Sequence, residues 1–206
     1  MRSLVALAFA TLTVGPIALA DEFDARMKQG FGHLRAGNVD AAVEVFRELQ
    51  TEAPDSDLVQ YSLAASKYRQ GLKDLENDLP DEAARQLREA RAEMAGLEGS
   101  PDAFVSRNAA FVAANCEAQL AKHLAQSGDH KKTLEAFREA IEGYEQVLQE
   151  APDHDGARQN YDHMRYLLKK MLQNPPPRQE QSKQGDEGDE EQQEGEQQQQ
   201  QPGEGE

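Results

Sequence analysis

Met27-Lys-Gln-Gly30-Phe-Gly-His-Leu-Arg-Ala-Gly37-Asn-Val-Asp-Ala-Ala42-Val-Glu-Val-Phe46-Arg-Glu-Leu49-Gln-Thr-Glu-Ala-Pro54 is the stretch that decides the fold of this chain. It predicts two short amphipathic helices, near residues 23–36 and 40–52, joined by a Gly-Asn turn and ended by proline. Apolar side chains recur at helical spacing on the second helix, at Val39, Ala42, Val43, Phe46 and Leu49. A hairpin this small cannot bury its apolar face alone, so similar units must stack on it.

The small, aromatic and proline residues of this stretch resemble those of one tetratricopeptide repeat, a unit of about 34 residues. They are Gly30, Ala42, Phe46 and Pro54. The resemblance implies an all-α, right-handed helical solenoid whose concave surface binds other polypeptides. Ala151-Pro152-Asp153 repeats Ala53-Pro54-Asp55, which indicates internal repetition.

The second unit is predicted from about residue 58, with a first helix that stops near Gly71 and a second that starts at Asp81. Ala83, Leu87, Ala90 and Met94 mark the buried face of that second helix. The segment Leu72 to Pro80 departs from the repeat. It either lengthens a helix or loop at one edge or makes a family-specific contact.

The third unit is predicted to have long helices, over about 102–126 and up to Glu150. A line of small residues on the first permits close packing, at Ala114, Ala118, Ala121 and Ala125. The apolar face of the second is Leu134, Phe137, Ile141, Tyr144 and Leu148. A last helix over about 154–173 has the apolar face Ala157, Tyr161, Met164, Leu168 and Met171. The sequence therefore predicts three hairpins and a capping helix, with no strand.

The two ends of the chain differ from this helical domain, residues 21–174. Residues 1–20 have a basic start, an apolar run and Ala18-Leu19-Ala20 before Asp21, the pattern of a cleaved secretory signal peptide. This favours a periplasmic protein with no stable membrane insertion after cleavage; an uncleaved inner-membrane anchor is the other interpretation. Apart from four prolines, residues 175–206 have no aliphatic or aromatic side chain, which predicts a disordered Gln/Glu-rich tail.

The charge of the chain excludes two classes of partner. It has 38 acidic and 22 basic residues, with ten of the acids in residues 178–206. Such a surface repels nucleic acid and anionic lipid. The single cysteine, Cys116, cannot form an internal disulfide; its helical, alanine-rich surroundings favour a buried apolar role over a reactive thiol.

Catalysis and metal binding have little support in the sequence. His154 and His163 are nine residues apart, which does not match a helical zinc pair. Asp153-His154-Asp155-Gly156 resembles part of a calcium loop, but its glycine is too early, and it serves equally as a helix start. No phosphate loop or nucleophile elbow is present, so neither cofactor nor catalytic residue is predicted.

A binding groove is the stronger prediction. The first helix of each tetratricopeptide repeat lines the concave face, and that pattern selects Lys28, Phe31, Arg35, Tyr61, Ala65, Tyr68, Arg69, Asn115, Gln119 and Lys122. This basic and aromatic line would suit an acidic or C-terminal peptide. The alternative is that the cations are merely exposed and the tyrosines belong to the core.

The end of the helical region resembles a more particular group. Glu150-Ala-Pro-Asp-His-Asp-Gly-Ala157-Arg-Gln-Asn160-Tyr161 and the Pro/Gln/Glu-rich tail resemble BatC-like tetratricopeptide proteins of aerotolerance operons. That resemblance implies an envelope scaffold working beside von Willebrand factor A domain proteins and a MoxR-type ATPase. The predicted function is a non-catalytic adaptor. The alternatives are an assembly factor for envelope complexes or cytochrome maturation, a structural solenoid that forms homodimers through its long third-unit helices, and, last, an enzyme.

One stability prediction follows from the composition of the tail. Deleting residues 178–206 should leave the melting temperature unchanged, because the segment has no apolar side chains to bury. Circular dichroism melts of the full and shortened chains would check this. A drop of many degrees would contradict the prediction.

Overall fold

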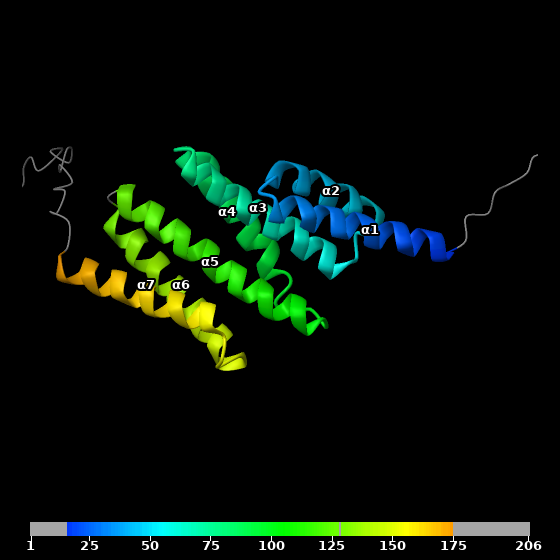
Figure 1. Cartoon of the computed structure of the whole chain (residues 1–206). Coiled ribbons are helices and arrows are strands. Elements are labelled where there is room, and N and C mark those ends of the chain that lie inside the picture. Colours follow the sequence, from blue (N-terminus) through cyan, green and yellow to red (C-terminus); the bar gives the residue numbers. More distant parts are fainter. Residues whose placement is uncertain (1–15, 128, 175–206) are drawn as a thin grey trace, which may run out of the picture. The chain divides into compact units, whose positions relative to one another are not determined.

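The computed structural model describes residues 16–127 and 129–174, and the regular elements of this part are all α-helices (Figure 1). Its elements are α1 (Pro16–Arg35), α2 (Val39–Glu52), α3 (Asp57–Glu76), α4 (Pro80–Ala95), α5 (Ala103–Ser127), α6 (His130–Glu150) and α7 (Asp155–Gln173). The predicted all-α class is confirmed for the described residues. Most of the predicted signal peptide and the whole tail lie outside them.

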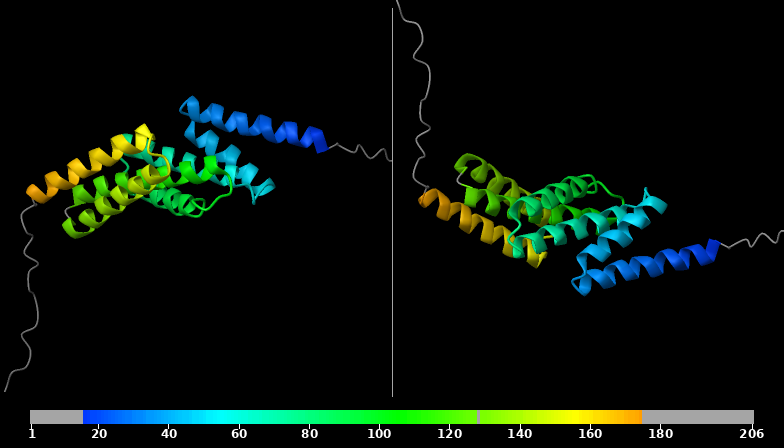
Figure 2. Two further views of the ribbon diagram at one scale, coloured as in Figure 1. Left: turned by 90° about the horizontal axis from the view of Figure 1, so that it is seen from below. Right: turned by 90° about the horizontal axis from the view of Figure 1, so that it is seen from above.

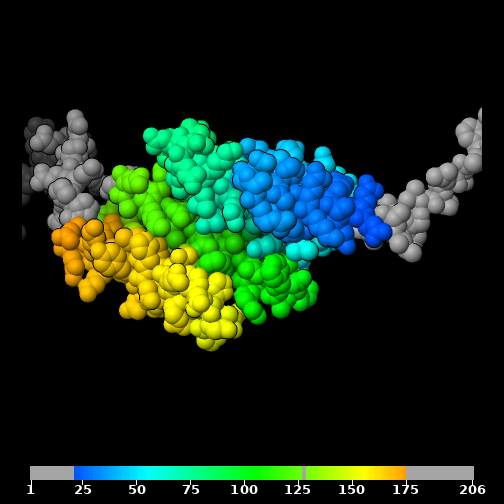
Figure 3. All heavy atoms as spheres, in the orientation of Figure 1, coloured from blue at the N-terminus to red at the C-terminus, as the bar shows by residue number. Residues whose placement is uncertain are grey.

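The seven helices form a stack of hairpins. Each helix packs against the next along the chain, which gives the hairpins α1–α2, α3–α4 and α5–α6 with α7 against the last (Figures 1 and 2). The first helices of neighbouring units also meet, because α3 contacts α5 and α5 contacts α7. In the view of Figure 3, α5 (green) is exposed between the blue N-terminal hairpin and α7 in yellow and orange. This is the solenoid arrangement predicted from the sequence, with α7 as its last helix.

Three apolar clusters hold the stack together, and each joins one hairpin to the first helix of the next unit. The first contains Phe46 and Leu49 of α2 with Leu63 of α3. The second joins α3 and α4 to α5, and the third joins α5 and α6 to α7. Because α3 and α5 each belong to two clusters, no hairpin has a core independent of its neighbours.

Polar side chains define where several helices begin. Ser56 accepts a hydrogen bond from the Val59 amide at 3.4 Å, and Asp102 accepts one from the Phe104 amide at 2.8 Å. His154 Nδ1 accepts from the Ala157 amide at 3.1 Å. These groups satisfy backbone donors that have no partner within the first turn of a helix. Asp153-His154-Asp155-Gly156 is thus a helix start, the simpler of its two interpretations.

The predicted end of α3 near Gly71 is wrong, because the helix continues to Glu76. Gly71 is a site of close helix packing: a Cβ there would lie 2.9 Å from Leu87 Cγ of α4. The irregular segment therefore lengthens a helix, and the turn is reduced to residues 77–79, where Asp78 has φ 62°. At the N-terminal end of the described residues, α1 begins at Pro16, earlier than predicted. Proline is compatible with the first turn of a helix.

Four predicted faces need partial correction. On α2, Val43 is only partly buried, and on α7 the same holds for Tyr161, Leu168 and Met171. Ala125 is exposed, whereas Ala114, Ala118 and Ala121 are buried as predicted. On α6 the buried side chains are Thr133, Ala136, Phe137, Ala140, Tyr144 and Val147. Leu134, Ile141 and Leu148 are only partly buried. The predicted face was right for Phe137 and Tyr144, but it missed the small side chains Ala136 and Ala140, which are buried beside them.

Gly30 and Gly32 offer a matched test of the packing of the first hairpin. A Cβ on Gly30 would lie 2.5 Å from Cζ of Phe46, whose side chain is fully buried, whereas a Cβ on Gly32 would meet nothing within 4 Å. We expect Gly30→Ala to lower the free energy of unfolding by about 1–3 kcal/mol through overpacking. Gly32→Ala should raise it by up to about 1 kcal/mol through helix propensity. Urea denaturation would measure both, and equal effects would contradict the packing described.

Candidate functional site

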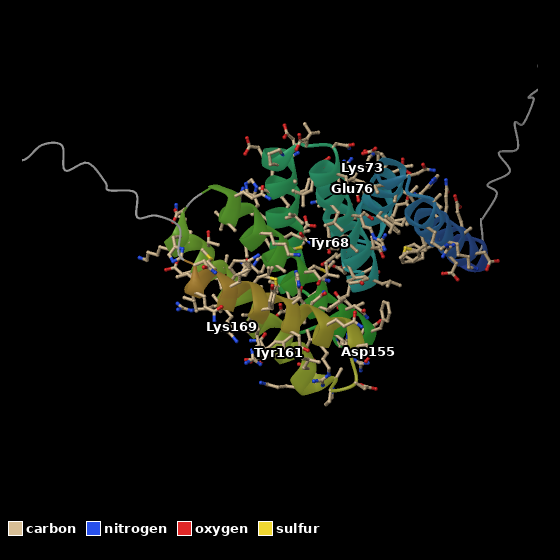
Figure 4. The ribbon with its side chains drawn as sticks, turned by 60° about the vertical axis from the view of Figure 1, so that its left-hand side comes forward. Tyr68, Lys73, Glu76, Asp155, Tyr161 and Lys169 are labelled. Carbon is tan, nitrogen blue, oxygen red and sulfur yellow. The ribbon has the colours of Figure 1, made fainter. Side chains whose placement is uncertain are left out.

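The first helices of the three hairpins enclose a groove of about 640 Å³. It is lined by Phe31, Leu34 and Arg35 of α1, by Tyr61, Ala65, Tyr68 and Arg69 of α3, and by Phe104, Asn108, Phe111, Val112 and Asn115 of α5. A second compartment of about 240 Å³ adjoins it, lined by Tyr68, Asn115, Ala118, Gln119, Lys122, Tyr144, Asn160, His163 and Met164. Because Tyr68 and Asn115 line both, the two compartments form one continuous surface, which we call the inner groove. Tyr68, which is labelled on its helix in Figure 4, lies where the two compartments meet.

The structure brings together nearly all of the side chains selected from the sequence. Phe31, Arg35, Tyr61, Tyr68, Arg69 and Asn115 line the first compartment, and Lys122 lines the second. Lys28 is the exception, since it is exposed on α1 and lines neither compartment. It lies one turn before Phe31, beyond the end of the cavity.

Sequence reasoning missed the start of α5. Phe104, Asn108, Phe111 and Asn115 follow one another at spacings of four, three and four residues, so they share one helix face. That stripe was a usable signal, but only its later residues, from Asn115 to Lys122, were selected. Asn160 and His163 were missed for another reason: α7 was interpreted only as a cap, and it also contributes to the groove.

Aromatic rings form the apolar part of the inner groove. Tyr61 and Phe104 meet edge to face with centroids 5.9 Å apart, and the Phe104 side chain is 58% exposed. At the α1 end, Phe31 packs edge to face on the buried Phe46 at 5.3 Å. An exposed phenylalanine beside a fixed tyrosine is a surface on which an apolar side chain of another molecule can pack.

A buried polar network supports the second compartment. The Asn115 side-chain oxygen accepts hydrogen bonds from the Tyr144 hydroxyl at 2.7 Å and from the Asn160 amide at 2.8 Å. One side chain of α5 thereby ties α6 and α7 together. Burial raises the pKa of Tyr68 to about 12, so its hydroxyl stays protonated at neutral pH. Burial also lowers the pKa of Lys122.

The inner groove has a charge opposite to that of the chain. In the part of the chain that the structure describes, no Asp or Glu lines its two compartments, although the chain has a formal net charge of −16. Its cations are Arg35, Arg69 and Lys122. Within the described residues, none of these three belongs to an ion pair, whereas Arg26, Lys67 and Lys73 are paired on other surfaces. The groove therefore offers unpaired positive charge beside apolar rings.

Metal binding and thiol chemistry have little support in the same part of the chain. No group of three or more His, Cys, Asp or Glu residues there could hold a metal ion. Cys116 is fully buried, and burial raises the pKa of its thiol to about 12, which disfavours the reactive thiolate. None of the described helices is both long and apolar enough to cross a membrane.

Comparison with known proteins supports the tetratricopeptide repeat predicted at the first hairpin. The tetratricopeptide repeat family matches residues 24–56, which run from α1 through α2 to the cap of α3. Among solved structures, the chain is similar to one titled "Crystal structure of MamA protein", at 14% identity and a TM-score of 0.31, over 77% of this chain and 98% of that one. The search of curated proteins gave no match. The chain thus carries one recognisable tetratricopeptide repeat at the start of a stack of helical hairpins.

Two asparagines of α5 test whether the polar network is structural. Asn115→Ala leaves the buried Tyr144 hydroxyl and the Asn160 amide without their acceptor, so we expect a loss of about 1–3 kcal/mol in unfolding free energy. Asn108→Ala removes only an exposed bond to the Phe104 carbonyl, and should change it by less than about 0.5 kcal/mol. Chemical denaturation of both variants would check this, and an equal cost would contradict the role given to Asn115.

Proposed function

We propose that this protein is a non-catalytic adaptor that binds an acidic polypeptide segment of a partner protein in its inner groove. The observation that carries the proposal is the charge of that groove: among the described residues, its lining is basic and has no acidic side chain, although the chain is strongly acidic. Electrostatic repulsion keeps an acidic segment away from most of the surface and leaves this groove as the favourable place to bind.

Different groove residues would contact different parts of the bound segment. Arg35 and Arg69 flank the aromatic compartment, where a guanidinium can make two parallel hydrogen bonds to a carboxylate. An apolar side chain of the segment packs on the exposed ring of Phe104. Asn108 and Gln119 have amide groups that can pair with the peptide backbone, and Lys122 offers a further positive charge in the second compartment.

The cellular setting that we propose is the bacterial periplasm. The support comes from the sequence: the signal-like residues 1–20, and the resemblance of the end of the helical domain and the tail to BatC-like aerotolerance proteins. In that setting the partners are von Willebrand factor A domain proteins working with a MoxR-type ATPase. A pull-down from envelope extract, with the groove variant described next as the matched bait, would test this part. If the unmodified chain captures those proteins and the groove variant does not, the proposed setting is supported. Equal recovery by both baits contradicts it.

The groove itself is tested with defined peptides. Fluorescein-labelled Glu-Glu-Phe-Glu-Glu should bind the full chain, and Lys-Lys-Phe-Lys-Lys should not. Arg35→Glu with Arg69→Glu should weaken binding of the acidic peptide at least about 100-fold, because charge-assisted bonds contribute about 1.5–3 kcal/mol each. Higher salt should weaken it as well. Fluorescence anisotropy measures all three effects.

The matched control reverses the same number of charges elsewhere. Arg85 and Arg88 lie on α4 and line neither compartment of the inner groove. Arg85→Glu with Arg88→Glu should therefore bind the acidic peptide almost as the unmodified chain does. Equal weakening by both double variants would mean that only the net charge matters, and would contradict a specific groove.

A further inference from the structure

The outer edge of the last unit has an open cavity between α6 and α7, separate from the inner groove. Its volume is about 560 Å³. It is lined by Arg138, Ile141, Glu142 and Glu145 of α6 and by Tyr161, Arg165, Leu168, Lys169, Leu172 and Gln173 of α7. We call it the α6–α7 wedge. Figure 4 shows Tyr161 and Lys169 along α7, apart from Tyr68 of the inner groove.

The repeat arrangement explains why the wedge is open. The equivalent spaces in the earlier units are each lined by three helices: α2, α3 and α4 in one, and α4, α5 and α6 in the other. In both, the second helix of the following hairpin closes the space. In the described part of the chain no such helix follows α7, so Leu172 stays 54% exposed and Ile141 and Leu168 stay partly buried. The wedge is therefore an apolar surface of the kind that another helix covers.

The charges along the wedge have opposite signs at its two ends. Near the turn between α6 and α7, Glu145 accepts a hydrogen bond from the Tyr161 hydroxyl at 2.7 Å. The two helices run in opposite directions from that turn, so Arg138 and Lys169 lie together farther along, toward Leu172. Arg165 and Glu142 lie between these ends, and the Arg165 guanidinium covers the Tyr161 ring at 5.3 Å.

We propose that the α6–α7 wedge is a homodimer interface in which α7 of one copy covers the wedge of the other, antiparallel and about a twofold axis. A strip that is negative at one end and positive at the other is complementary to itself under this symmetry. Lys169 of each copy then meets Glu145 of the other, Arg165 near the axis meets Glu142, and Leu168 and Leu172 are buried between the helices. This interface uses α7 and the outer side of α6. It does not use α5, because the open face of α5 lines the inner groove.

This dimer extends the proposed function without resting on it. The interface shares no lining residue with the inner groove, so both grooves remain open. Two grooves on one dimer would bind a partner with repeated acidic segments far more tightly than one groove does.

The first test is the mass of the full chain by size-exclusion chromatography with light scattering. The unmodified chain should have twice the monomer mass at about 100 μM. Leu172→Glu should give the monomer mass, because it places a charge in the buried strip. Leu79→Glu should remain dimeric, since Leu79 is a comparably exposed leucine (43%) in the α3–α4 turn. A monomeric unmodified chain, or equal dissociation by both variants, would overturn the proposal.

A charge exchange separates this interface from a mere effect on folding. Lys169→Glu and Glu145→Lys should each weaken dimerisation at least about tenfold, because each places like charges opposite one another. The double variant restores the opposite pairing and should recover most of the dimer. Circular dichroism must show the same helix content in all three. Failure of the double variant to recover would overturn the antiparallel arrangement.

Discussion

The structure depends on one constraint: a helical hairpin of this size cannot bury its own apolar face. Each of the three clusters therefore includes the first helix of the next unit, and α5 belongs to two of them. Small side chains make the close approach possible, as where a Cβ on Gly143 would lie 2.9 Å from the Ala114 Cβ. The same stacking brings α1, α3 and α5 together along the inner groove, and within the described residues no helix follows α7. Both candidate binding surfaces are thus consequences of how the apolar faces are buried.

The sequence was sufficient to predict the helices and much of the lining of the inner groove. Periodicity predicted the buried Ala42, Phe46 and Leu49, because strict helical spacing leaves only one face to bury. It placed Arg35, Tyr68 and Asn115 on the groove because the repeat specifies which helix faces inward. It failed at Gly71, because glycine as a helix end and glycine as a close-packing site look alike without the facing Leu87. Likewise, nothing in the sequence of α7 showed that one helix would serve the core, the groove and an open edge.

The distribution of charge connects the fold to the proposed function. Among the described residues, most of the cations that form ion pairs lie on outer surfaces. Lys67, for example, pairs with Glu89 and Glu93. Arg35, Arg69 and Lys122 line the groove, and none of them forms an ion pair with another described residue, so the groove is locally positive on an acidic chain. A neutral groove would bind by apolar contact alone and would select poorly among segments. The proposed adaptor would instead select a partner segment by the sign of its charge.

The most direct test of this account is to map where an acidic peptide binds, by amide chemical-shift changes in isotope-labelled full chain. If the account holds, the largest changes on adding the Glu-rich peptide fall on residues around Arg35, Tyr68, Arg69, Phe104 and Lys122, and residues on the outer faces of α2 and α4 change little. Changes centred on any other surface, or none at millimolar peptide, would contradict it.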